Sequence, residues 1–222
     1  MQHLLRNISY TGGINMPPKV KFLKEEIIEA AVNITREKGI SAVTAREVGA
    51  ALGVSSRPLF TYFKSVDELK IEVYNYAQRL YEEYVVEGLA QEIPFLGVGQ
   101  QYIRFAKEET ELYKYLFLSP PEGIKGSAMN ALKHSQKLVQ SSLMKIYNIS
   151  APTADKYFRD LWLVSYSLTT LIVTGECPYS DKEISDIFSE FSVSICKAYK
   201  EIPGLAEGNY NKDEVFRKLV SE

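Results

Sequence analysis

Apolar residues recur every three or four positions along almost the whole of this sequence, and this spacing limits the fold more than any other feature. Leu23, Ile27, Ala30 and Ile34 form the first such stripe, and comparable stripes continue to about residue 199. These positions share one face of an α-helix, whereas a half-buried strand requires alternation of apolar and polar residues, which is nowhere sustained. The sequence therefore predicts an all-α protein.

Start and stop signals divide the chain into separate helices. Serine or threonine three positions before glutamate is the pattern of a capping box, in which each side chain satisfies a free backbone N–H at a helix start. The pattern occurs at Thr44–Glu47, Ser65–Glu68 and Ser180–Glu183. The long helices are expected at residues 21–38, 65–88, 127–147 and 152–174, and from residue 180 onward.

The segment from Thr44 to Lys64 contains two short helices joined by a glycine turn at Gly53-Val54. Ser55 is the expected N-cap of the second helix, with Pro58 in its first turn, where a missing N–H costs little. A tight turn of this kind is typical of a helix-turn-helix, which holds its second helix rigidly enough to enter the major groove of DNA.

The outward side chains of this second helix are candidate DNA contacts. Leu59 and Phe63 lie four residues apart and are expected to face inward. The side chains left outside are Ser56, Arg57, Phe60 and Thr61, with Ser55 and Tyr62 at the edges. An arginine near the start of a recognition helix can reach O6 and N7 of guanine, and helix N-termini attract phosphate.

The segment VTAREVGAALGVSSRPLFTYFKSVDEL resembles the N-terminal DNA-binding domain of the TetR family of transcriptional regulators, over roughly residues 20–70. The shared features are Gly53-Val54-Ser55 at the turn, the aromatic residues Phe60, Tyr62 and Phe63, then Lys64 and Glu68-Leu69. The resemblance implies base contacts from Ser56 and Arg57. It implies phosphate contacts from Thr44, Ser55, Thr61, Tyr62 and Lys64.

Two positions depart from the family pattern, and several residues have a plain structural interpretation as well. Many relatives carry tyrosine in place of Phe60 and lysine in place of Val66, so two phosphate contacts are lost, although Phe60 can still touch a thymine methyl. Tyr62 is equally suited to cap the core of the small domain. Lys64 is also compatible with simple solvation, and Arg46 is expected to form an ion pair near Glu47 rather than a DNA contact.

The resemblance further implies a C-terminal helical body that binds a small effector. The candidate effector contacts are Tyr102, Phe105, Tyr113, Phe117, His134, Trp162 and Tyr166. Aromatic residues at helical spacing more often form a core than a ligand cage, and His134 is more often a surface or core histidine. If they do bind an effector, an apolar or amphipathic molecule, including an aromatic one, is expected.

A symmetric dimer is expected, built from the two long C-terminal helices. The helix at about 152–174 is too apolar to face water, so it and the helix at about 180–199 are expected to pair with their copies in a four-helix interface. Two recognition helices about 34–36 Å apart would then read a pseudo-palindromic operator. The family's usual mode is repression that a small effector relieves.

Four segments are expected along the chain: a disordered extension at 1–18, a helix-turn-helix domain at 19–66, an effector-binding and dimerisation domain at 67–204, and a polar tail at 205–222 with at most one further turn. Residues 19–64 carry eight Lys/Arg and five Glu, a net charge of +3. Residues 65–222 carry 17 Lys/Arg and 23 Asp/Glu, a net charge of −6. A basic module on an acidic body fits a nucleic-acid partner for the first part.

The sequence gives little support for an enzyme, a metalloprotein, a secreted protein or a membrane protein. The histidines His3 and His134 and the cysteines Cys177 and Cys196 lack metal-ligand spacing, and no phosphate-loop, dinucleotide or nucleophile-elbow motif occurs. The sequence therefore predicts no enzyme, no cofactor and no metal, and no segment reads as a secretory signal or a membrane span. A cytoplasmic location is expected by default. Two alternatives to a regulator remain open: a DNA-binding nucleoid or division factor, and a ligand-binding or partner-binding protein with a vestigial DNA-binding head.

Overall fold

The computed structural model describes residues 22–121 and 127–221, and within these ranges every regular element is a helix. The all-α prediction is therefore confirmed. The extension expected at residues 1–18 lies outside the described residues. None of the described helices combines the length and the apolar character that a membrane-spanning segment needs.

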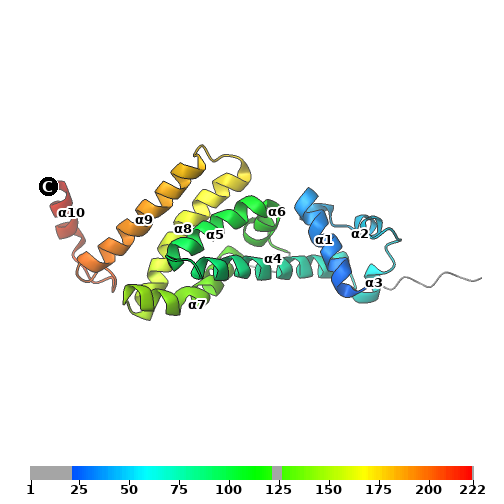
Figure 1. The fold of residues 1–222 in the computed structure, drawn as a ribbon, viewed down its shortest axis with the longest axis horizontal. Helices are drawn as coiled ribbons and strands as arrows, with labels where there is room; N and C mark the ends of the chain where they lie inside the picture. Colours follow the sequence, from blue (N-terminus) through cyan, green and yellow to red (C-terminus); the bar gives the residue numbers. More distant parts are fainter. Residues whose placement is uncertain (1–21, 122–126, 222) are drawn as a thin grey trace, which may run out of the picture.

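The N-terminal head is a small three-helix unit (Figure 1). Helix α1 spans Lys24–Lys38, α2 spans Ala45–Ala51 and α3 spans Leu59–Tyr62. Ile27 and Ile34 of the expected stripe are buried in one core with Val48, Leu59 and Phe63. Leu23, also expected to face inward, stands at the N-cap of α1 and is 61% exposed. Gly39 ends α1 with φ of +79°, a left-handed conformation that favours glycine, as the sequence predicts.

Helix α4, Val66–Leu89, runs from the head into the body (Figure 1). Ser65 caps it by accepting a hydrogen bond from the Glu68 backbone N–H at 3.3 Å. The Glu68 carboxylate accepts from Lys64 N at 2.7 Å instead of from Ser65, so only half of the expected capping box forms. The box at Ser180–Glu183 is complete, with bonds in both directions.

The body consists of helices packed around the far part of α4. They are α5 (Pro94–Glu108), α6 (Thr110–Tyr113) with a π-helical turn at Lys114–Leu118, α7 (Ser127–Tyr147), α8 (Ala151–Thr174) and α9 (Asp181–Glu201). The segment 205–222, expected as a polar tail, holds a ten-residue helix, α10 (Lys212–Ser221), none of whose residues is buried. It projects from the end of the body beyond α9 (Figure 1).

Glycines allow α4 and α5 to cross so closely that their backbones are in contact. A Cβ atom built on Gly88 of α4 would lie 2.6 Å from the Cα of Val98 in α5, and one built on Gly97 would overlap the carbonyl oxygen of Gly88. Two residues after Gly97, a Cβ on Gly99 would overlap the ring of Phe188 in α9. Because a side chain has no room at these points, the close crossing depends on glycine.

The head touches the body through α1 as well as through α4. Lys24 of α1 lies 2.6 Å from the carboxylate of Glu72 in α4. Arg36, near the other end of α1, donates two hydrogen bonds to Glu109, 2.8 and 2.7 Å long, just before α6. The Glu109 side chain is only 14% exposed, so this ion pair is better shielded from solvent than an ordinary surface pair.

Candidate nucleic-acid interface

The turn between α2 and α3 is built around two glycines. Thr44 caps α2 by accepting from the Glu47 backbone N–H at 3.2 Å. A Cβ on Gly49 would lie 2.9 Å from the backbone carbon of Ser55, so only glycine lets the chain after the turn approach α2 this closely. Gly53 has φ of +68°, and the Val54 N–H returns to the Gly49 carbonyl at 2.9 Å. The turn is therefore fixed by hydrogen bonds and by close packing.

Helix α3 begins later than the sequence predicts. Pro58, not Ser55, stands at its N-cap position, and the Ser55 side chain makes no cap hydrogen bond. The prediction of Ser55 as N-cap is wrong, and Pro58 offers a reason, because a proline disfavours the helical conformation at the residue before it, here Arg57. The chain bends at Ser56 and turns at Arg57-Pro58 before the four residues of α3.

Most predicted DNA contacts are free to meet a partner. Thr44, Ser55, Arg57, Phe60, Thr61, Tyr62 and Lys64 are exposed, and Ser56 is half-buried. Arg57 and Lys64 form no ion pair with any described residue. Phe60 is 52% exposed, although it is a large apolar side chain. Leu59 and Phe63 are buried, as predicted.

Tyr62 is partly used within the head. Its hydroxyl donates to the backbone carbonyl of Phe22 at 2.9 Å, which ties α3 to the chain before α1. Tyr62 as a whole remains 44% exposed. The hydroxyl therefore has a structural partner, while the ring faces solvent.

The ion pair expected for Arg46 is not formed among the described residues. Arg46 is exposed, and the cation near Glu47 is Lys38 of α1, at 3.9 Å. Arg46 therefore adds an unneutralised positive charge to α2. This charge lies in the same helix that Thr44 caps.

In the body, five of the candidate effector contacts form one packed aromatic cluster. Tyr102, Phe105, Tyr113, Phe117 and Trp162 are all buried. The cluster also contains Tyr81 of α4, whose ring centroid lies 5.3 Å from that of Phe117. The hydroxyls of Tyr102 and Tyr113 are hydrogen-bonded, 3.1 Å apart. The Tyr113 hydroxyl is also hydrogen-bonded to the Thr169 hydroxyl, at 2.5 Å. These residues thus serve as core in this structure.

The cavity beside this cluster is small. It measures about 20 Å³ and is lined by Tyr81, Tyr102, Trp162 and Phe188 among others. A space of this size holds about one water molecule. Burial raises the pKa of Tyr81, Tyr102 and Tyr113 above the ordinary value, so these hydroxyls stay protonated at neutral pH.

The remaining two candidates lie apart from this cavity. Tyr166 is half-buried and stacks on Trp162, with ring centroids 5.0 Å apart. His134 lies where α7 meets α4, and its Nε2 is 2.8 Å from the Glu82 carboxylate. His134 therefore fits the interpretation of a partnered histidine near the surface.

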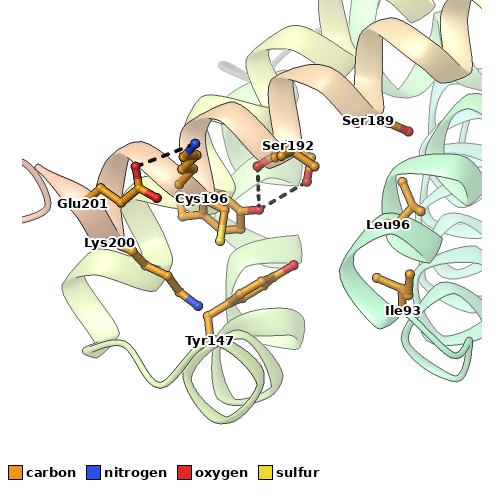
Figure 2. Close-up of a pocket in the computed structure, with 11 residues that line it drawn as sticks. Ile93, Leu96, Tyr147, Ser189, Ser192, Cys196, Lys200 and Glu201 are labelled. Atoms are coloured by element: carbon orange, nitrogen blue, oxygen red, sulfur yellow. Dashed lines mark hydrogen bonds and ion pairs between the residues drawn. The ribbon is translucent and has the colours of Figure 1, made fainter.

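Sequence reasoning missed a larger hollow on another side of the body. A groove of about 410 Å³ lies between the start of α5, the end of α7, and α9 (Figure 2). We call it the α9 groove and define it by Ile93, Leu96, Val193, Cys196, Lys197 and Lys200. These residues come from distant parts of the chain, and no local pattern joins them.

The buried head core and the exposed, unpaired face of α3 are the arrangement of a helix-turn-helix DNA-binding domain, here joined to an all-helical body. Residues 27–73 match the family model described as bacterial regulatory proteins, tetR family. Over these residues the N-terminal unit is similar to the TetR family, as its sequence resemblance predicts.

Solved structures show the same fold over about three quarters of the chain. A TetR family member from Streptomyces coelicolor A3 is 17% identical with a TM-score of 0.55, and the similarity covers 75% of this chain and 95% of that one. The multidrug binding protein EbrR, complexed with imidazole, is 16% identical with a TM-score of 0.51, covering 75% and 92%. No curated protein matches this chain by sequence. Family model and fold together support a DNA-binding transcriptional regulator.

Proposed function

We propose that this protein is a dimeric, sequence-specific transcriptional repressor that a small effector releases from a pseudo-palindromic operator. The observation that carries the proposal is the exposed face of α3. Arg57, just before α3, and Lys64, just after it, are exposed without ion pairs to other described residues, within the segment that matches the TetR family model. Cations left unpaired on a rigid, groove-sized element are suited to base edges and phosphates.

The hydrogen bonds within the head limit the roles that we propose for individual residues. The Thr44 oxygen already accepts from Glu47 N, so its hydroxyl hydrogen is free to donate to a phosphate. Tyr62 already donates its only hydroxyl hydrogen to Phe22, so it can meet DNA through its ring but not as a phosphate donor. We assign base contacts to Ser56 and Arg57, thymine-methyl contact to Phe60, and phosphate contacts to Thr44, Ser55, Thr61 and Lys64.

The test is binding to the promoter DNA beside the protein's own gene, measured by fluorescence anisotropy across a salt series with a scrambled duplex as control. The proposal requires binding with two chains per site that exceeds binding to the scrambled duplex at moderate salt. Equal and steeply salt-dependent binding to both duplexes would mean phosphate attraction alone at that site. Many dispersed genomic sites would then favour a nucleoid or division factor, and no DNA binding would favour a vestigial head.

We propose that α8 and α9 form the dimer interface. They pack side by side along one edge of the body (Figure 1). Leu163 and Leu171 of α8 are 47% and 37% exposed, and Phe191 of α9 is 47% exposed. Large apolar side chains that share an edge of a single chain are suited to burial against a second copy.

Glutamate at Leu163 or Phe191 is expected to shift the protein from dimer to monomer, because each change would bury two unpaired carboxylates at a symmetric interface. Sedimentation velocity at micromolar concentration measures the shift. Ile146→Glu on α7 is the matched control, since Ile146 is 44% exposed and lies on a different helix. Unchanged dimers in both test variants, or equal dissociation in the control, would place the interface elsewhere.

For regulation, we propose that effector binding shifts the balance between two positions of the head. Helix α4 carries Tyr81 in the aromatic cluster, and its N-cap, Ser65, directly follows the DNA-reading segment. A displacement of α4 within the body therefore changes the spacing of the two α3 helices in a dimer. The effector can favour one position only by binding it more tightly than the other.

A further inference from the structure

The α9 groove has apolar walls that nothing in the described chain covers. Val193 of α9 is 66% exposed and Ile93, just before α5, is 56% exposed, and they face the same hollow together with Leu96. Figure 2 shows Ile93 and Leu96 across the hollow from α9, with the Tyr147 ring below it. The groove's volume of about 410 Å³ falls within the range of small-molecule sites, roughly 300–1,000 Å³.

One end of the groove carries excess positive charge. Lys197 lies 3.9 Å from the Glu201 carboxylate, a long and exposed pair. Lys200 has no carboxylate partner among the described residues, and its ammonium lies 5.7 Å from the centre of the Tyr147 ring. Two cations and one anion leave this end with a net charge of +1. An ammonium beside apolar walls is suited to the head of an amphipathic anion.

The groove is separate from the proposed dimer face. Val193 and Phe191 are two residues apart, which places them roughly 200° apart around α9 at 3.6 residues per turn. Pairing of two chains through Phe191 therefore leaves Val193, Cys196 and Lys200 on another side of the helix. The aromatic cavity, in contrast, has room for about one water molecule.

We propose that the α9 groove binds a small amphipathic anion, with an acyl or alkyl tail against Ile93, Leu96 and Val193 and a carboxylate at Lys200. In the regulator proposed above, this molecule is the effector, and that role alone rests on the proposed function. A molecule bound in the groove contacts both α9 and the start of α5, so its binding can displace them relative to each other. Because α5 crosses α4 at the backbone contact of Gly88 and Val98, the groove is mechanically connected to the helix that carries the head.

Cys196 supplies a direct measure of occupancy. It is a free, half-buried thiol within the groove, and Cys177, the other free cysteine, lies outside it. Sodium decanoate is the probe. In the otherwise unchanged protein carrying Cys177→Ser, saturating decanoate is expected to slow alkylation of Cys196 about tenfold, and isothermal titration calorimetry gives its Kd. Decanol, which lacks the carboxylate, is expected to bind more weakly.

The lysine variants identify the carboxylate site. Lys200→Gln is expected to weaken decanoate binding roughly tenfold, the typical effect of losing a hydrogen bond to a charged group. Lys182→Gln is the matched control, because Lys182 lies on α9 outside the groove and pairs with Asp186. Val193→Trp, which fills the groove from an exposed position, is expected to abolish both binding and protection.

Each outcome bears on a distinct claim. Absence of protection at Cys196, or equal weakening by Lys200→Gln and Lys182→Gln, overturns the groove as an anion site. Protection by decanoate without any change in operator affinity retains the anion site and overturns its role as the effector site. Operator binding that fails for the unliganded protein overturns the proposed function and leaves the alkylation result standing.

Discussion

Alanine at Gly88 is expected to destabilise the body by about 2 kcal/mol, and circular dichroism should show the melting temperature falling by about 4–8 °C. Two effects oppose each other. Replacing a helical glycine by alanine stabilises a helix by up to about 1 kcal/mol. The new Cβ, however, would lie 2.6 Å from the Val98 Cα and N and 2.7 Å from the Gly97 carbonyl carbon. All three are backbone atoms, so the clash can be removed only if α4 and α5 separate. We expect this steric cost to exceed the gain in helix propensity.

Glu83→Ala provides the control for Gly88→Ala. Glu83 is exposed on the same helix and should change stability by no more than about 0.5 kcal/mol. A Gly88→Ala protein as stable as the wild type would show that the two helices are farther apart than described here. The Gly88→Ala variant also tests the mechanical connection from the α9 groove, because separated helices should reduce the effect of decanoate on operator affinity.

Arg57→Ala is expected to weaken operator binding about thirtyfold or more. A bidentate arginine–guanine contact contributes about 1–3 kcal/mol, and a dimer loses one in each half-site, so the total is about 2–6 kcal/mol. The folded head should not change, because the Arg57 side chain is exposed and forms no ion pair with the described residues. Anisotropy titrations of operator and scrambled duplexes at one salt concentration measure the effect.

Arg46→Ala separates base reading from general positive charge. Arg46 is an exposed arginine of α2 in the same head and is expected to weaken operator and scrambled DNA alike. If Arg57→Ala also weakened both duplexes equally, Arg57 would be a phosphate contact. Base reading would then have to come from Ser56, Phe60 or the shape of the DNA.

The sequence predicts the head more fully than the body. The helices of the head are marked by local signals, such as Thr44 before Glu47 and the glycine turn at Gly53, and the structure has both. The late start of α3 also has a local cause, because proline at 58 disfavours the helical conformation at Arg57. The prediction of Ser55 as N-cap requires a helical Arg57 and so conflicts with this preference.

The body depends on contacts between distant residues, which periodicity does not report. Spacing alone places Tyr102 and Tyr113 on inner faces, but it does not tell a filled core from a ligand cage. Gly88 and Gly97 look like ordinary helix breakers until α4 and α5 are seen to cross there. The α9 groove joins residues near positions 93, 147 and 196, so only the assembled fold reveals it.

The Arg36–Glu109 pair limits how the head can move. A head joined to the body only through α4 could tilt in any direction. This head is also fastened at the end of α1, by two hydrogen bonds to a largely buried carboxylate. A rigid unit held at two points, here the junction with α4 and the Arg36–Glu109 pair, can rotate freely only about the line that joins those points. The two recognition helices of a dimer would thus follow a defined arc, on which spacing and tilt change together.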